Sequence, residues 1–305
     1  MRWKLLSTLV LSVALATFGL TSVFGESDIA NNEQLNAIGV VVNQTTELPV
    51  LPTTKAKSFI IADMNTGKIL AAKNVHKQLP PASTLKALTS LALLNKLDPD
   101  DLYTAKRSDA KVYGNKVGIF PGRKYKIESI WYGLLLHSGN DAGMALAHAG
   151  GGLTKTLEEM TAAARGVKAM NTIPKSPHGL DAPGQVSTAF DLALIGRAVF
   201  EKDEFRRYAR TKSYVFPRSG RENVKKTLYN TNKLLTTYPG LIAGKTGFTT
   251  LGKNTYVGAA RQNGQVLIIA FMGLPYGRDA LATELFDWGF AVGNTIEPVG
   301  QLPKP

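Results

Sequence analysis

The 305-residue chain contains no cysteine, which excludes disulfides, thiolate metal sites and a cysteine nucleophile. Histidine is nearly as scarce, and the His-Glu-x-x-His pattern of zinc peptidases is absent. The chain also lacks the Gly-x-Ser-x-Gly elbow that presents the serine of many hydrolases. We therefore expect no metal or other cofactor, and a fold that is stabilised by its apolar core alone. The histidines are widely spaced, at His76, His137, His148 and His178.

The N-terminal 25 residues have the pattern of a targeting segment. Arg2 and Lys4 precede an apolar run without charges, residues 5–24, which is typical of a secretory signal peptide. Because the run is nearly long enough to cross a bilayer, an uncleaved N-terminal membrane anchor stays open as the alternative. We expect the protein to be exported to the cell envelope, on the outer face of the cytoplasmic membrane or secreted.

The chain is strongly basic, with a formal net charge of +13. Such a charge is compatible with nucleic acid, but an exported protein rarely meets any, so we expect no nucleic-acid partner. A solvated cationic surface, or attraction to an anionic envelope polymer, accounts for the charge instead.

The remainder of the chain divides into a linker, one domain and a tail. Residues 26–56 are polar and interrupted by prolines, as in a flexible linker. Residues 57–293 hold the predicted domain: a strand hairpin, then several helices from about 85 to 200, then three strands from about 245 to 272 and a closing helix. This order predicts an α+β fold, an α/β sandwich whose antiparallel sheet combines both ends of the domain around an inserted helical lobe. Residues 294–305 form the tail.

Three short motifs follow one another through this domain. They are Ser83-Thr84-Leu85-Lys86, Ser138-Gly139-Asn140 and Lys245-Thr246-Gly247. Each is common by chance, but their order and spacing match the signature of penicillin-recognising serine enzymes, except that Gly139 stands where class A β-lactamases usually have Asp.

The residue types in these motifs suit nucleophilic catalysis. A serine needs a base within hydrogen-bond reach, and Lys86 lies one helical turn from Ser83 on the same face. Lys86 can accept a proton near neutral pH only if burial or a second cation, such as Lys245, lowers its pKa. Ser138 can relay a proton to the leaving amine, and the Asn140 amide can hold the substrate's peptide group.

The third motif suits the binding of an extended substrate. Lys245, Thr246 and Gly247 start a predicted edge strand, to which a peptide can add through backbone bonds. Gly247 has no side chain to obstruct that approach. The amide groups of Ser83 and Phe248 are the candidate donors to a developing oxyanion.

Taken together, the stretches around Ser83, Ser138, His178 and Lys245 resemble the low-molecular-mass penicillin-binding proteins, the D-alanyl-D-alanine carboxypeptidases of peptidase family S11. The resemblance covers residues 57–293. It implies a β-lactamase/transpeptidase-like fold, an acyl-enzyme on Ser83, and removal of the terminal D-alanine from peptidoglycan stem peptides. It also implies inhibition by covalent reaction with β-lactam antibiotics, and a monomer.

The resemblance also assigns roles to single residues. Ser83 would be the nucleophile, Lys86 the general base, Ser138 the proton relay and Lys245 the ligand of the substrate carboxylate. Relatives use an arginine on a later strand or turn for the same carboxylate, and Arg278 is the candidate here.

Two rival functions share the scaffold. A class A-like β-lactamase needs a glutamate beyond the second motif to activate water, and residues 160–200 contain none. A non-catalytic peptidoglycan-binding protein would not need the intact pair of Ser83 and Lys86. The sequence does not distinguish lysine from diaminopimelate in the stem peptide.

Overall fold

A computed structural model of the chain describes residues 32–304. The predicted targeting segment, residues 1–25, and the first part of the predicted linker lie outside the described residues. Within residues 32–304, no helix is both long enough and apolar enough to cross a membrane.

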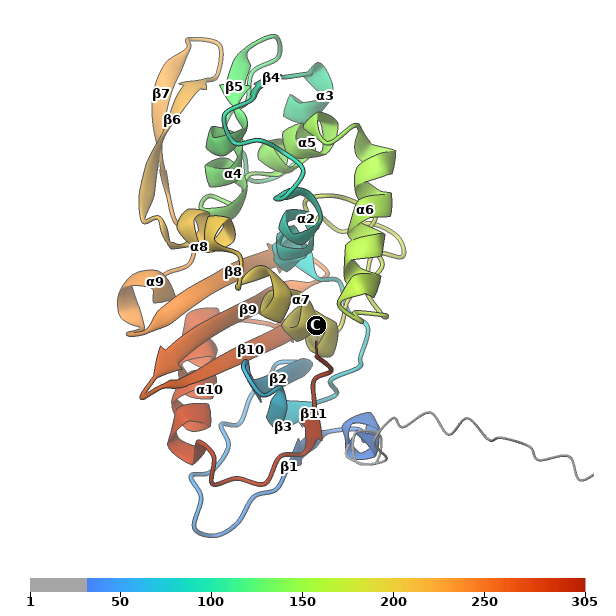
Figure 1. Cartoon of the computed structure of the whole chain (residues 1–305), viewed down its shortest axis with the longest axis vertical. Coiled ribbons are helices and arrows are strands. Elements are labelled where there is room, and N and C mark those ends of the chain that lie inside the picture. The colour runs from blue at the N-terminus through green and yellow to red at the C-terminus, as the bar shows by residue number, and fades with distance from the viewer. Residues whose placement is uncertain (1–31, 305) are drawn as a thin grey trace, which may run out of the picture.

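One antiparallel sheet forms the base of the molecule (Figure 1). Its strand order is β1-β3-β2-β10-β9-β8, and β11 pairs with β3 beside β1. The strand hairpin predicted at the start of the domain is confirmed as β2 and β3, whose turn contains Asn65-Thr66-Gly67, and it pairs with the C-terminal strands through β10. The strands are β1 (Val40–Val42), β2 (Ser58–Asp63), β3 (Lys68–Lys73), β8 (Leu241–Thr249), β9 (Lys253–Gln262), β10 (Gln265–Leu274) and β11 (Gly300–Gln301).

Both faces of the sheet are covered by helices, because its central strands are apolar on both sides. Helix α7 (Ala189–Val199) places Gly196 against Ile268, and α10 (Arg278–Val292) places Gly289 against Leu267 on the opposite face. Neighbouring residues of a strand point to opposite faces, so the two helices enclose the sheet between two cores.

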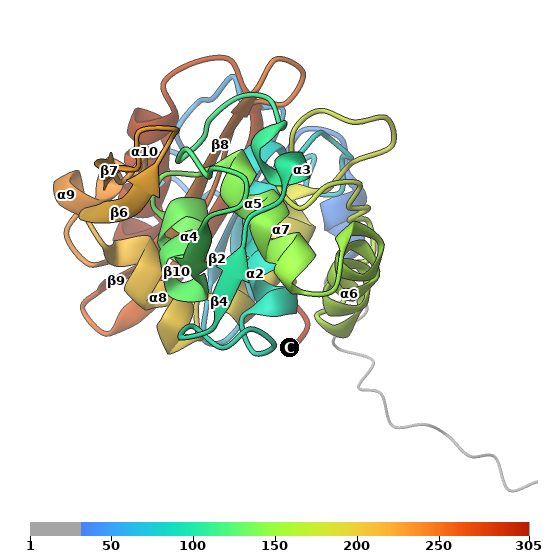
Figure 2. The same cartoon turned by 90° about the horizontal axis from the view of Figure 1, so that it is seen from above.

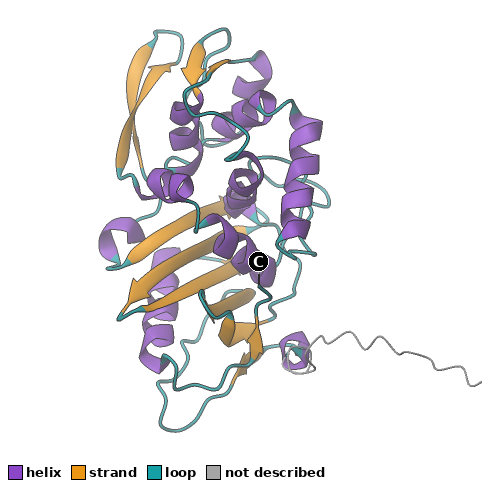
Figure 3. Ribbon diagram, viewed as in Figure 1, coloured by secondary structure: helices purple, strands orange, loops and turns teal. Residues whose placement is uncertain are grey.

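The helical lobe lies between the two halves of the sheet in sequence and beside the sheet in space (Figures 1 and 3). Helix α2 packs against α6 and α7, and α4 packs against α5 and α8. The view from above shows α2, α4 and α5 grouped together, with the hairpin of β6 and β7 at their side (Figure 2). The lobe's helices are η2 (Ala82–Leu85), α2 (Lys86–Leu93), α3 (Arg107–Ala110), α4 (Ile127–Leu135), α5 (Asn140–Ala149), α6 (Leu153–Gly166), α8 (Asp203–Arg210) and α9 (Leu234–Thr237).

Two small two-stranded antiparallel sheets, which the sequence patterns do not reveal, complete the lobe. The first pairs β4 (Leu102–Thr104) with β5 (Lys124–Lys126), with α3 between them in sequence, and the second is the hairpin of β6 (Ser213–Ser219) and β7 (Val224–Tyr229). The expected architecture, a sheet from both chain ends with an inserted helical lobe, is confirmed.

The folded unit extends beyond residues 57–293 at both ends. Part of the segment expected to be linker forms η1 (Glu33–Asn36) and β1, and part of the expected tail forms β11. The physical reason is that the backbone groups on the outer edge of β3 would otherwise be unpaired. Strand β1 pairs with the second half of β3, and β11 pairs with its first two residues. Leu35 joins the core, and Asn32 bonds to Gln301.

We therefore predict that Leu35→Ala lowers the free energy of unfolding by about 2–3 kcal/mol, as for other buried leucines. Leu35 is only 2% exposed. Ile38→Ala is the matched control, because Ile38 is 98% exposed and its loss should change stability by about 0.5 kcal/mol or less. Urea unfolding of both variants measures the difference, and equal stabilities would show that this segment is only a linker.

Candidate active site

Ser83 lies in the short turn η2, directly before α2. The turn is held by two hydrogen bonds to the Pro81 carbonyl. The Thr84 hydroxyl donates one from within the turn, and the Thr255 hydroxyl donates the other from β9, at 2.9 Å. Ser83 itself is partly exposed, whereas Lys86 is fully buried. The turn therefore presents the hydroxyl to solvent and the amine to the interior, with the predicted spacing of one helical turn.

The Lys86 amine has three hydrogen-bond partners. They are Ser83 Oγ at 2.7 Å, Asn140 Oδ1 at 2.8 Å and the backbone oxygen of His178 at 2.8 Å. The last two are carbonyl oxygens, which only accept. A neutral amine has two N–H bonds and one lone pair, so the carbonyls take both hydrogens and the lone pair is left for the hydroxyl of Ser83.

Electrostatics favour this neutral form. Burial lowers the pKa of Lys86 well below its ordinary value, the nearby Lys245 cation lowers it further, and Asp141 opposes the shift. An ammonium in this place would be stripped of water and would face a second cation. A lysine base needs a lowered pKa, and for Lys86 both causes expected from the sequence, burial and a second cation, act in that direction.

The second motif forms the connection between α4 and α5. Ser138 adopts a left-handed conformation, with φ of 61°, which few residues other than glycine take. A Cβ on Gly139 would lie 2.8 Å from Val117, so the aspartate of class A β-lactamases would not fit here without a local shift. The strained turn aims the Ser138 hydroxyl at Lys245, whose Nζ donates to it at 3.0 Å.

Asn140 and Asp141 are the first two residues of α5, whose N-cap position is Gly139, and both bond to the loop before β5. Asn140 accepts from Lys86 and donates to the Tyr113 carbonyl at 2.8 Å, which ties it to the loop before β5. Asp141 is buried and accepts from the backbone amides of residues 117–119, so it fixes the same loop.

The third motif lies on the edge strand β8, as predicted. Lys245 is 1% exposed, and Thr246 contacts the hydroxyl of Thr231 at 3.1 Å. A Cβ on Gly247 would lie 2.3 Å from Thr255 Oγ1 and 2.9 Å from the Ser83 amide nitrogen. Only glycine therefore lets β8 approach the turn that carries Ser83. Phe248, the next residue, is 61% exposed at the opening of the site.

Arg278 lies at the start of α10 and reaches this region. Its guanidinium donates to Asp279 at 2.8 Å and to the Thr231 carbonyl at 3.4 Å. Burial lowers the pKa of Lys245 to about 7, and the positive charge of Arg278 contributes to that shift. The structure thus groups Lys245, Thr246 and Arg278 at one end of the site.

A loop that sequence reasoning did not connect with the base also takes part. The His178 carbonyl reaches Lys86 because the loop backbone presses against η2: a Cβ on Gly179 would lie 1.9 Å from the Ala82 oxygen. Gln185 braces the loop by accepting from Ser176 and donating to the Leu180 carbonyl. The signal in the sequence is the His178-Gly179 pair, where the positive φ of Gly179 permits the close approach.

A cleft of about 560 Å³ opens beside Ser83. Its walls come from the loop before β5, from the loop of His178 and from the end of β8; they include Ser83, Tyr113, Gly114, Asn115, Asn140, Leu180, Asp181, Phe248, Thr249 and Thr250.

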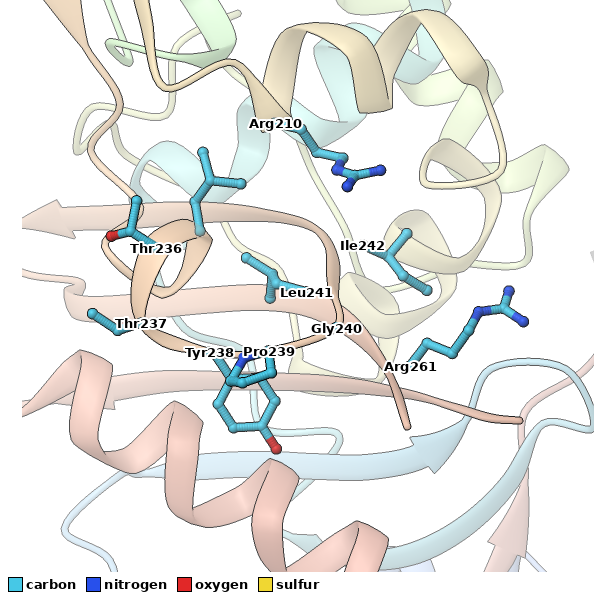
Figure 4. A pocket seen from close by; sticks show the side chains of 10 residues that line it. Arg210, Thr236, Thr237, Tyr238, Pro239, Gly240, Leu241, Ile242 and Arg261 are labelled. Carbon is cyan, nitrogen blue, oxygen red and sulfur yellow. The ribbon is translucent and has the colours of Figure 1, made fainter. Parts of the chain in front are cut away.

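A second hollow, of about 520 Å³, lies by the opposite end of β8 and contains none of the motif residues (Figure 4). Arg210 and Arg261 extend into view on either side of Ile242. Of the two, only the first cleft is lined by motif residues, namely Ser83 and Asn140.

The arrangement agrees with comparisons to known proteins. Residues 42–275 match the model of the D-alanyl-D-alanine carboxypeptidase family, peptidase S11. The chain belongs to this family. It is 40% identical to D-alanyl-D-alanine carboxypeptidase DacB2 of Mycobacterium tuberculosis over 83% of this chain and 88% of the relative. It is 29% identical to DacF of Bacillus subtilis, over 96% and 72%.

Solved structures of S11-like enzymes have the same fold. The crystal structure of a D-alanyl-D-alanine carboxypeptidase from Mycobacterium tuberculosis superposes with a TM-score of 0.79 at 38% identity, covering 85% of this chain and 99% of that one. The Streptomyces K15 DD-transpeptidase superposes with a TM-score of 0.74 at 27% identity, covering 80% and 100%. The chain is thus a serine-type hydrolase of the penicillin-binding class.

We predict that Gly247→Ala slows acylation by a β-lactam by about tenfold or more. The added methyl group must displace the Ser83 amide or Thr255, and misplacement of a reacting group by about 1 Å can cost 100-fold. Gly166→Ala is the control, since a Cβ there meets nothing within 4 Å. Stopped-flow acylation of both variants tests this, and a normal rate for Gly247→Ala would contradict the close approach of β8.

Proposed function

We propose that the S11 enzyme acts through an acyl-enzyme on Ser83, with Lys86 as its general base. The observation that carries this proposal is the 2.7 Å contact between Lys86 Nζ and Ser83 Oγ. In the neutral amine, the two carbonyl partners of Nζ accept its two hydrogens, and the lone pair is then available to the Ser83 hydroxyl. The substrate is the terminal D-Ala-D-Ala of a peptidoglycan stem peptide, and the product is D-alanine.

In the proposed reaction the Ser83 proton moves to Lys86 as Oγ bonds to the carbonyl carbon of the penultimate D-alanine. The amides of Ser83 and Phe248 stabilise the oxyanion. The C–N bond then breaks, and Ser138 passes a proton to the departing amine from its position beside Lys245. Water finally cleaves the ester and regenerates Ser83. β-Lactams react with the same serine and remain bound to it.

The same geometry supports a site for the substrate's terminal carboxylate. Lys245 and Arg278 supply positive charge, and Thr246 supplies a hydroxyl next to Lys245. The Asn140 amide lines the cleft with Ser83 and keeps one N–H, besides the one donated to Tyr113, for the substrate's peptide group. The set proposed for substrate binding is thus Lys245, Thr246, Gly247, Phe248 and Arg278.

Efficient β-lactam hydrolysis is less well supported. The loop that approaches Lys86 offers the His178 carbonyl and no glutamate, and the only carboxylate that lines the described cleft is that of Asp181. This residue is engaged by Thr249 and Leu251. A β-lactam ester on Ser83 should therefore persist, which separates this function from that of a class A enzyme.

For the cellular setting, we propose an exported monomer that acts in the cell envelope. The apolar run of residues 5–24 supports export and allows attachment to the membrane through the N-terminus. Peptidoglycan is the polymer that the family's activity addresses.

We predict that Ser83→Ala abolishes both covalent labelling by fluorescent penicillin and release of D-alanine from a stem pentapeptide. Lys86→Arg should lose both activities almost completely, because a guanidinium does not deprotonate near neutrality. Mass spectrometry of the peptide products and gel fluorescence measure the two activities. Ser90→Ala is the control, since Ser90 lies on the next turn and bonds only to the Lys86 carbonyl. Labelling that survives Ser83→Ala would point to another nucleophile.

We also predict that affinity for a peptide carboxylate falls as pH rises above about 7. The lowered pKa of Lys245 means that the free protein holds this cation below pH 7 and loses it above, so binding must then take up a proton. The dissociation constant should rise by up to about tenfold per pH unit. Calorimetry on the Ser83→Ala variant between pH 6 and 9 measures it without turnover.

The matched control for this prediction is the double variant Ser83→Ala with Lys245→Arg. An arginine keeps its charge across this pH range, so the affinity of the double variant for the peptide carboxylate should be nearly independent of pH. Equal slopes in the two proteins would exclude Lys245 as the titrating ligand of the carboxylate.

A further inference from the structure

Charges of opposite sign lie near the two ends of the β8 segment that begins at Lys245. Lys245 and Arg278 supply positive charge at its start. The cleft beside Ser83 reaches the last residues of β8, and Asp181 is the only charged residue among those that line it. In a chain with a net charge of +13, a carboxylate at the opening of the site is a local exception.

Asp181 has capacity for a further ligand. One carboxylate oxygen accepts from the Thr249 hydroxyl at 2.7 Å, and the other accepts from the Leu251 amide at 3.0 Å. A carboxylate offers about four lone-pair sites, so two remain. Among residues 32–304, no lysine, arginine or histidine forms an ion pair with Asp181. Its negative charge is therefore fixed in place but not neutralised.

The position of Asp181 along β8 can be related to an extended substrate. Thr249, to which Asp181 is bonded, lies three residues beyond Thr246 on this strand, or about 10 Å at the usual rise of an extended chain. A peptide whose carboxylate lies at Lys245 and Thr246 must run antiparallel to β8 to enter the cleft. The peptide residue two positions before the C-terminal residue then lies about 7 Å further along β8 than the carboxylate end. The side chain of this residue spans the rest of the way to the level of Thr249.

We propose that Asp181 binds the side-chain ammonium of the diamino acid that precedes D-Ala-D-Ala in the stem peptide. This inference rests on the proposed function and deepens it. The exposed rings of Tyr113 and Phe248, which line the same cleft, are placed to cover the methylene groups of that side chain. Cross-linking acylates the amine and removes its charge, so the enzyme should prefer stems whose amine is still free.

Two peptides that differ only at the ε-nitrogen of the lysine test the proposal. They are diacetyl-L-Lys-D-Ala-D-Ala, in which the ε-amine is acetylated, and the monoacetyl peptide, in which it is free. For the wild-type protein we expect kcat/KM to be about tenfold higher for the free amine, mainly through KM. The ratio should fall as salt is added, because a partly exposed ion pair is screened.

Asp181→Asn should bring the ratio of the two kcat/KM values close to one, and Asp181→Glu should restore part of it. Thr249→Val is the matched control: it removes the hydroxyl that holds Asp181 but leaves the carboxylate charge. If Asp181 only braces the end of β8, Asp181→Asn and Thr249→Val will lower activity on both peptides alike, and the ratio will stay at its wild-type value.

The outcomes separate the two hypotheses. Equal hydrolysis of both peptides by the wild-type protein would overturn the role of Asp181 and leave the carboxypeptidase function standing. Hydrolysis of neither peptide would overturn both. Should Asp181→Asn fail to fold, as judged by penicillin labelling and thermal unfolding, the salt dependence of the wild-type ratio decides: a ratio near one, or one insensitive to salt, contradicts the ion pair.

Discussion

The chemistry of this protein depends on three hydrogen bonds to the amine of Lys86. Its partners belong to separate parts of the chain: Ser83 on the adjoining turn, Asn140 at the start of α5 and His178 in the loop before α7. Because the amine is completely buried, water cannot replace a missing partner. The helical lobe, the loop and the turn must therefore be held together to within a hydrogen-bond length for the base to exist.

Close backbone contacts supply that precision. The strand β8 meets the Ser83 turn at Gly247, and the loop of His178 meets the same turn at Gly179. At both positions a single methyl group would separate the segments. Carboxylate contacts fix the remaining loops, since Asp141 gathers three amides of the loop before β5 and Asp181 joins the loop of His178 to the end of β8. The site is thus rigid because packing and polar contacts restrict the same few turns.

Much of this could be predicted from sequence because the determining patterns are local. The spacing of Ser83 and Lys86, the hairpin around Gly67 and the alternating strands after Gly244 each depend on neighbouring residues. What could not be predicted depends on residues far apart. The His178 carbonyl carries no side-chain signal, and the short valine run of β1 has its pairing partner, β3, about 30 residues further along the chain. The role of Asp141 likewise depends on backbone amides that lie 22–24 residues earlier in the chain.

The pairing of β1 and β11 with β3 has a consequence for attachment. Both strands lie on the edge of the sheet opposite β8, separated from it by five strand spacings, or about 24 Å. A group attached at Asn32 or Gln301, which bond to each other beside β3, would thus lie on the side of the sheet remote from β8. A dye or a surface linker at either residue should leave the entrance to Ser83 unobstructed, and a molecule immobilised in this way would present its catalytic edge outward.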